Sequence, residues 1–140
     1  TKKPAKRKSL KGIKVLLAED NDLNAELATI LLEDSEMIVT HAADGQEVVD
    51  LFANHPAGTY DIILMDIMMP KMNGLQAAKA IRAMQAERPD AEEIPIIALS
   101  ANAFAEDVQT SLDAGMNGHI SKPLNVAEVA KVIARNLNKS

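Results

Sequence analysis

The 140-residue chain contains no cysteine, which excludes both a disulfide framework and a thiolate metal site. No apolar run approaches the roughly 20 residues that a membrane-spanning helix needs. The basic amino end is not followed by the apolar core of a signal peptide. The phosphate-binding patterns G-x-x-x-x-G-K-[ST] and G-x-G-x-x-G are also missing, so nucleotide binding has little support.

The net charge of −5 is unevenly distributed along the chain. Residues 1–11 carry six basic and no acidic side chains, which leaves 9 basic against 20 acidic groups, a net charge of −11, in the remainder. Such an acidic body repels nucleic-acid phosphates, so we expect no direct contact with nucleic acid. With Pro4 and Ser9, the basic segment is typical of a linker. We predict a linker over 1–11 and one domain over 12–140.

Apolar runs and helical periodicities alternate five times after the linker. The predicted strands cover residues 13–18, 37–41, 61–66, 94–99 and 118–121. The predicted helices cover 22–34, a segment around 48–52, 73–84, 104–112 and 125–137. We interpret 88–93 as a polar loop. The alternation predicts an α/β fold, in which a parallel sheet carries helices on both faces and right-handed crossovers join the strands.

Local signals support three of the helix boundaries. Asn73 is a candidate cap for the helix that follows it. Asn125 and Glu128 have the spacing of a capping box. Gly115 follows a predicted helix, where a left-handed glycine commonly ends the helix.

The segment Asp61–Pro70 organises the chain. Its apolar run predicts a strand buried on both faces, and Asp66 stands at the carboxyl end of that run. Open α/β sheets bind their ligands at that edge. Taken alone, Asp66 can equally be a polar residue that marks where the strand becomes a loop.

Polar residues follow four of the five apolar runs: Glu19–Asp20, Asp66, Ser100 and Lys122. In a parallel sheet these ends share one edge, so Asp20 and Asp66 are close together if their strands are neighbours. Two carboxylates about 4 Å apart repel by roughly 1 kcal/mol in water and about 4 kcal/mol at an effective dielectric of 20. The cluster therefore favours a cation, and oxygen ligands without His or Cys favour Mg²⁺.

This edge of the sheet suits phosphoryl chemistry. Asp66 is placed to attack as a nucleophile, while Mg²⁺ and Lys122 offset the charge on the phosphoryl oxygens. The Ser100 hydroxyl is a donor for one of those oxygens. Each residue also has a plainer interpretation: the acidic run favours the positive end of the first helix, Ser100 is a loop hydroxyl, and Lys122 is a surface lysine.

The ordered motifs resemble the receiver domain of two-component response regulators over residues 12–138. The matching stretches are Val15–Asn21, Met65–Pro70, Met72–Gly74, Ile96–Ala101 and Lys122–Pro123. The resemblance implies a flavodoxin-like, receiver-type fold with five parallel strands in the order 2-1-3-4-5.

The resemblance also implies a role for each matching residue. Asp66 would be the phosphoacceptor, supplied by a histidine kinase domain or a His-containing phosphotransfer domain. Glu19, Asp20 and Asp66, with the Met68 backbone carbonyl, would hold Mg²⁺. Lys122 would contact the phosphoryl group.

Switching is implied for the far half of the sheet. Ser100 would turn toward the phosphoryl group and bias the surface of the fourth predicted helix, the fifth strand and the last helix. Two positions depart from the family pattern. His119 stands where stand-alone regulators usually carry Tyr or Phe, so it is either a switch residue or a loop-edge histidine. Met68 cannot orient a hydrolytic water, a role that Asn102 would take instead.

Several details are closest to receivers of hybrid sensor histidine kinases: Asn24 after Glu19–Asn21, the stretch Ala98–Ala103, and the stretch Ala114–His119. The chain begins with Thr1, and we expect it to be a carboxy-terminal piece of such a kinase. By itself it would catalyse only its own phosphorylation and dephosphorylation. We expect a cytoplasmic location; tethering to a membrane-bound sensor and a weak homodimer are left open.

Two rival functions compete with the receiver. A phosphatase of the haloacid dehalogenase type also uses a strand-end Asp, but it wants a second Asp where this chain has Met68. A receiver-like interaction module would work without phosphate, which the acidic cluster, Ser100 and Lys122 argue against.

Overall fold

The computed structural model describes residues 11–56, 58–67, 69, 71–100, 105–121 and 124–137. For residues 100, 105–108 and 137 it describes the backbone alone. The predicted linker over 1–11 therefore lies outside the described residues, except for Lys11. Gly12 N–H donates to the Glu36 carbonyl at 2.9 Å, and Ile13 is fully buried. The chain is therefore in contact with the rest of the domain from residue 12, where the predicted domain begins.

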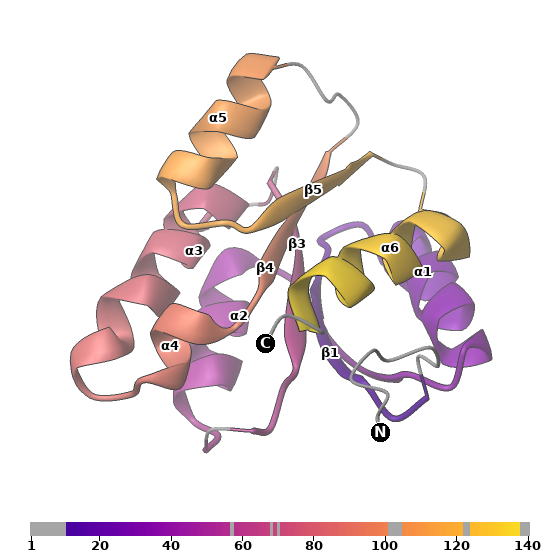
Figure 1. Cartoon of the computed structure of the whole chain (residues 1–140), viewed down its shortest axis with the longest axis horizontal. Coiled ribbons are helices and arrows are strands. Elements are labelled where there is room, and N and C mark those ends of the chain that lie inside the picture. The colour runs from indigo at the N-terminus through magenta and orange to yellow at the C-terminus, as the bar shows by residue number, and fades with distance from the viewer. Residues whose placement is uncertain are drawn as a thin grey trace.

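Five parallel strands form one sheet in the order β2-β1-β3-β4-β5. They are β1 (Lys14–Ala18), β2 (Ile38–Ala42), β3 (Ile62–Asp66), β4 (Ile96–Ser100) and β5 (Gly118–Ser121). This arrangement confirms the α/β class and the 2-1-3-4-5 order. Because all five strands run the same way, their carboxyl ends share one edge of the sheet (Figure 1).

Six α-helices and one 3₁₀ helix surround the sheet within the described part of the chain. They are α1 (Asp22–Asp34), α2 (Gly45–Ala53), α3 (Gly74–Arg82), the 3₁₀ helix η1 (Ala83–Ala86), α4 (Asp90–Glu93), α5 (Ala105–Asp113) and α6 (Val126–Leu137). Helices α1 and α6 cover one face, and α2, α3 and α4 cover the other (Figure 1). None of the described helices is long and apolar enough to cross a membrane.

Strand β3 is the centre of both hydrophobic cores. Ile62 and Leu64 pack into the cluster under α1 and α6, whereas Ile63 and Met65 pack into the cluster under α2 and α3. All four side chains are fully buried, so the prediction of a strand buried on both faces is confirmed. Asp66 is therefore the last residue of a strand that is buried along its whole length.

The predicted helix signals hold where the structure describes them. Asn73 caps α3, and its side chain and Gln76 form a reciprocal capping box. The Asn125 side chain accepts the Glu128 N–H at 2.8 Å, as the first half of a capping box requires. Gly115 has φ = +99°, which confirms the left-handed position after α5.

Some predicted boundaries shift by one or two residues. Strand β2 starts at Ile38 because the Met37 N–H turns back to the Leu32 carbonyl at the end of α1. Strand β4 starts at Ile96 rather than residue 94, since Pro95 has no N–H to donate. Its carbonyl still accepts the Ile63 N–H at 2.9 Å.

The prediction of a loop over 88–93 was wrong for residues 90–93, as was the extension of the preceding α-helix to Met84. The α-helix ends at Arg82, and the turns η1 and α4 follow. Pro89 has φ = −57°, which suits the start of a helical turn, and Ala91 is fully buried. The polar composition of residues 88–93 gave no indication of this packed turn.

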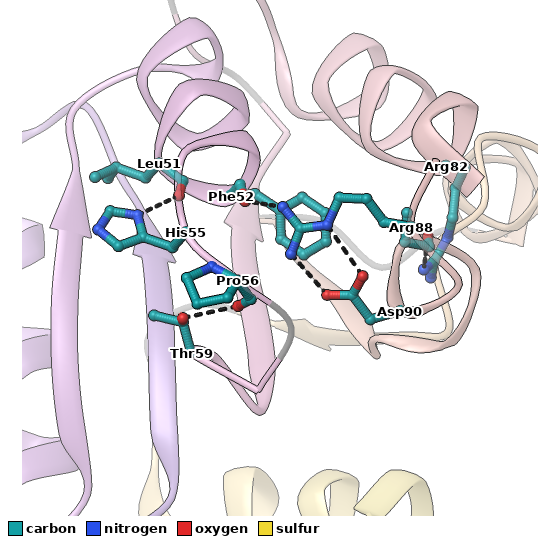
Figure 2. A network of polar contacts seen from close by, with 9 residues as sticks. Leu51, Phe52, His55, Pro56, Thr59, Arg82, Arg88 and Asp90 are labelled. Atoms are coloured by element: carbon teal, nitrogen blue, oxygen red, sulfur yellow. Dashed lines mark hydrogen bonds and ion pairs between the residues drawn. The ribbon is translucent and has the colours of Figure 1, made fainter. Parts of the chain in front are cut away.

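Arg88 explains how this polar segment is held (Figure 2). Its guanidinium forms two hydrogen bonds to the Asp90 carboxylate, at 3.1 and 2.8 Å. It also donates to the Phe52 carbonyl and lies 4.2 Å above the centre of the Phe52 ring. These contacts fasten the segment to the end of α2.

Arg82 ties together the edge of the sheet opposite to Asp66. It donates to the Ala91 and Ile94 carbonyls at 3.0 and 2.8 Å, and to the Gly115 carbonyl at 2.9 Å. A further bond reaches Asn117 Oδ1 at 2.6 Å. Burial lowers the pKa of Arg82, an effect that the nearby negative charge of Glu92 partly opposes. One cation thus joins α3, α4 and the α5–β5 turn.

Replacing Arg82 with Leu is expected to lower the free energy of unfolding by about 2–4 kcal/mol, since hydrogen bonds to a charged group contribute roughly 1.5–3 kcal/mol each. Urea denaturation measures the loss. Arg135→Leu is the matched control because Arg135 is exposed on α6. Equal unfolding midpoints for the two variants would show that the Arg82 contacts add nothing to stability.

Candidate functional site

Three carboxylates meet at the carboxyl edge of the sheet. Glu19 and Asp20 follow β1, and Asp66 ends β3. The two strands pair with Ala18 opposite Met65, and one carboxylate oxygen from each of the three residues lies within 4.8 Å of the others. Glu19 and Asp66 are buried, whereas Asp20 is exposed. The predicted proximity of Asp20 and Asp66 is confirmed.

The turn after β1 is fixed by its own hydrogen bonds. Glu19 N–H donates to the Ala42 carbonyl at 3.0 Å, which continues the β1–β2 pairing by one residue. The Glu19 carboxylate accepts the Asn21 N–H at 3.2 Å. Asn21 in turn caps α1 by accepting the Asn24 N–H at 2.9 Å. The acidic residues therefore occupy a turn whose end is the start of a helix.

The connection after β3 passes very close to Asp66. Gly74 N–H donates to the Ile67 carbonyl at 2.9 Å. A Cβ at position 74 would lie 2.3 Å from the Asp66 carbonyl oxygen and 2.9 Å from Ile67 Cα. Lys71 has φ = +65° and forms an ion pair with Asp44 at 3.5 Å. The first residue of α3 is therefore packed directly against the backbone of Asp66 and Ile67.

The acidic cluster suits a hard divalent cation. Carboxylates at this separation repel one another by roughly 1 kcal/mol in water and several-fold more in a partly buried site. A cation bound between the carboxylates replaces this repulsion with attraction. The three donors are all oxygens, with no His or Cys among them, and this set matches the preference of Mg²⁺.

The structure places the other predicted site residues unevenly. Ser100 is the last residue of β4 and pairs with Ser121 of β5, so its backbone lies on the same edge as Asp66. Lys122, Met68 and Asn102 lie outside the described residues. Their roles stay predictions.

His119 lies within β5, opposite Ala98 of β4, and not at a loop edge. Its Nε2 atom is buried and has no hydrogen-bond partner in the described part of the chain. Leaving a buried polar atom unsatisfied costs roughly 1–3 kcal/mol. A rearrangement that gave Nε2 a hydrogen-bond partner would therefore remove this cost.

The sequence reading missed two features near the cluster. His41 of β2 places Nε2 2.7 Å from the Glu19 carbonyl oxygen. A groove lined mainly by apolar side chains also begins at Glu19, and its lining is Glu19, Asn24, Leu27, Ala28, Leu31, Leu99 and Leu124. The sequence did hold one signal for the groove, because the helix over 22–34 has more apolar residues than one buried face can hold.

The helical spacing of Leu23, Leu27, Ile30 and Leu31 predicts a helix over 22–34, and the structure confirms it, but the first three of these residues face solvent. The exposed fractions are 63% for Leu23, 57% for Leu27 and 59% for Ile30. The buried residues of α1 are instead Ala25 and Leu32. We call Leu23, Leu27 and Ile30 the α1 apolar face.

This sheet order, with carboxylates clustered at the ends of two adjacent central strands, defines a receiver-type α/β domain. The family model for the response regulator receiver domain matches residues 15–134, and the chain belongs to that family.

The sequence is also similar to short segments of much longer histidine kinases and sensor proteins. It is 37% identical to Histidine kinase 1 of Arabidopsis thaliana, over 85% of this chain and 12% of the relative. It is 35% identical to the sensor protein GacS of Pseudomonas syringae, over 91% of this chain and 14% of the relative. The chain thus spans only a small part of the length of these curated relatives.

Solved structures of receiver domains have the same fold. The receiver domain of sensor histidine kinase PA1611 from Pseudomonas aeruginosa has a TM-score of 0.79 and 35% identity, over 91% of this chain and 99% of that one, and it holds a magnesium ion in its active-site cleft. The Ssk1 receiver of Saccharomyces cerevisiae, solved with the phosphotransfer protein Ypd1, has a TM-score of 0.80 and 28% identity, over 92% and 91%.

Gly74→Ala is expected to lower the free energy of unfolding by about 1–3 kcal/mol, since its Cβ meets backbone atoms that cannot rotate away. Backbone amide shifts should move at Asp66 and Ile67. Gly118→Ala is the control, because a Cβ there would meet only side-chain atoms, the nearest being the tip of Ile97 at 3.2 Å. An equal loss of stability in both variants would contradict the close approach at Gly74.

Proposed function

We propose that Asp66 accepts a phosphoryl group from a phosphohistidine, carried by a histidine kinase domain or a His-containing phosphotransfer domain. The acidic cluster at the end of β3 is the observation that carries this proposal. An Asp66 carboxylate oxygen attacks phosphorus and forms an acyl phosphate. The P–N bond to the donor imidazole breaks, and the imidazole leaves with a proton from solvent.

Mg²⁺ is the proposed cofactor, and when bound it offsets negative charge on the transferring phosphoryl oxygens. Glu19, Asp20 and Asp66 would hold it, together with the Met68 carbonyl. The magnesium ion in the PA1611 receiver supports this assignment. The buried carboxylates of Glu19 and Asp66 bring acidic oxygens to the site, and the exposed Asp20 leaves it open to solvent.

The remaining roles follow from the shared sheet edge. Lys122 and the Ser100 hydroxyl would contact the phosphoryl oxygens, and Asn102 would orient the water that later hydrolyses the acyl phosphate. Ser100 and His119 would act as the switch. The responding surface would be α5, β5 and α6, which correspond to the fourth predicted helix, the fifth strand and the last predicted helix.

A shift of this kind has a defined energetic requirement. Moving an equilibrium from 1:99 to 99:1 takes roughly 5.5 kcal/mol of differential interaction. A few charge-assisted hydrogen bonds of about 1.5–3 kcal/mol each are sufficient. Giving the unpaired Nε2 of His119 a partner would add to that difference.

Incubation with acetyl phosphate and Mg²⁺ should add the mass of one phosphoryl group to the intact wild-type chain. Asp66→Asn should gain none, because its amide is not a nucleophile, and chelation of Mg²⁺ should suppress the wild-type gain. Asp61→Asn is a matched control, because Asp61 directly precedes the other end of β3, where its carboxylate accepts the Lys14 N–H.

Intact mass spectrometry separates the rival functions. Phosphate retained by Asp66→Asn would contradict the assignment of Asp66 as the phosphoacceptor. Continuous turnover of p-nitrophenyl phosphate by the wild type would favour a phosphatase. A wild type that gains no mass would favour an interaction module that works without phosphate.

The α1 apolar face is the proposed docking surface for the phosphodonor. Leu23, Leu27 and Ile30 are exposed, and Leu27 also lines the groove that begins at Glu19. A partner seated there lies beside the acidic cluster, as direct transfer to Asp66 requires. The Ssk1–Ypd1 complex supports a phosphotransfer protein as that partner. An amphipathic helix that presents aliphatic side chains fits such a face.

Leu27→Asn should lower the rate of phosphorylation by a phosphotransfer protein about tenfold, since a central interface side chain contributes more than 1 kcal/mol. Phosphorylation by acetyl phosphate should stay unchanged, because that small donor needs no docking. Leu112→Asn is the control: Leu112 is exposed on α5, away from the α1 apolar face. Equal loss with both donors would place the effect of Leu27 in the site rather than in docking.

A further inference from the structure

We propose that His41 is a positioning residue for the acidic cluster. Its imidazole fixes the backbone of the turn that carries Glu19 and Asp20, and so sets the geometry in which these carboxylates receive Mg²⁺. This inference rests on the proposed function, because it concerns the same metal site.

The contact is a short hydrogen bond from a side chain to a backbone carbonyl. His41 Nε2 lies 2.7 Å from the Glu19 carbonyl oxygen. A carbonyl oxygen only accepts, so Nε2 carries the hydrogen and donates. The neutral ring with its proton on Nε2 and the imidazolium both supply that donor, so the contact does not depend on the charge of His41.

Strand β2 thereby holds both peptide groups that flank the Glu19 Cα. The preceding peptide donates its N–H to the Ala42 carbonyl at 3.0 Å. The following peptide receives the His41 hydrogen bond through its carbonyl. Together they restrain the backbone on both sides of the Glu19 Cα, and therefore the direction of its Cα–Cβ bond. The second peptide also includes the nitrogen of Asp20, so the same bond orients both acidic residues.

His41 is suited to positioning rather than to holding the fold together. It lies on the edge strand β2, and its side chain is exposed. Water can satisfy the Glu19 carbonyl if the imidazole is removed, so the fold should survive. Water cannot hold the turn in one place. Mg²⁺ demands near-ideal octahedral geometry, so its affinity is sensitive to that loss.

The test compares the Mg²⁺ dissociation constants of full-chain variants by isothermal titration calorimetry. His41→Leu should weaken Mg²⁺ binding at least about tenfold, the lower end of the effect of residues that orient metal ligands. His41→Gln should recover most of the affinity, because its side-chain amide donates to the same carbonyl. Thermal unfolding midpoints without Mg²⁺ should stay close to that of the wild type.

His55→Leu is a matched control. The His55 ring also contacts a backbone carbonyl, with Nδ1 2.7 Å from the Leu51 oxygen, at the carboxyl end of α2 (Figure 2). The same substitution there removes a bond of the same kind and length away from the cluster, and Mg²⁺ affinity should be unchanged. In the metal-free protein, the amide signals of Glu19 and Asp20 should move in His41→Leu and not in His55→Leu.

Three results would overturn the role of His41 alone: wild-type affinity in His41→Leu, a His41→Gln variant as weak as His41→Leu, or an equal loss in His55→Leu. A wild-type chain that binds no Mg²⁺ would instead overturn the metal site itself, and the role of His41 with it.

Discussion

The parallel pairing of β1 with β3 is the constraint on which the rest of the molecule depends. It sets Ala18 beside Met65, so the next residues along each strand bring Glu19, Asp20 and Asp66 together. Like charges do not assemble in this way unless something stronger holds their backbones. Here that is the fully buried β3, packed on both faces by aliphatic side chains. The hydrophobic core therefore supplies the free energy that keeps an electrostatically unfavourable cluster in place.

The two edges of the sheet have opposite characters. The carboxyl edge carries the three clustered carboxylates, two of which lie in a turn. The opposite edge is held together by the guanidinium of Arg82. Because Arg82 holds the Gly115 carbonyl, the end of α5 is anchored far from Asp66. A change that starts at the carboxyl edge thus meets a fixed point at the other end of the same helix. This geometry favours tilting of α5 over displacement of the whole helix.

Sequence alone predicted what depends on local pattern. The apolar run before Asp66, the cap at Asn73 and the glycine at 115 each carry their own signal, and the structure agrees at all three. Polar residues hide the turn at 90–93 because the contact that fastens it to α2, from Arg88 to the Phe52 carbonyl, joins segments far apart in sequence. His41 was missed for the same reason: nothing near position 41 shows that β2 lies beside the turn at Glu19. Periodicity also located α1 without telling which of its apolar residues face solvent, since that depends on where the sheet lies.

Three aliphatic side chains left in water on α1 have a consequence for any experiment on the isolated chain. Exposed apolar patches are typical of interaction sites, and at high protein concentration a second copy of the chain offers the same face. Self-association would then compete with the phosphodonor by mass action. Rates of phosphotransfer should accordingly be compared across a dilution series, in which the apparent affinity for the donor improves as the receiver becomes more dilute.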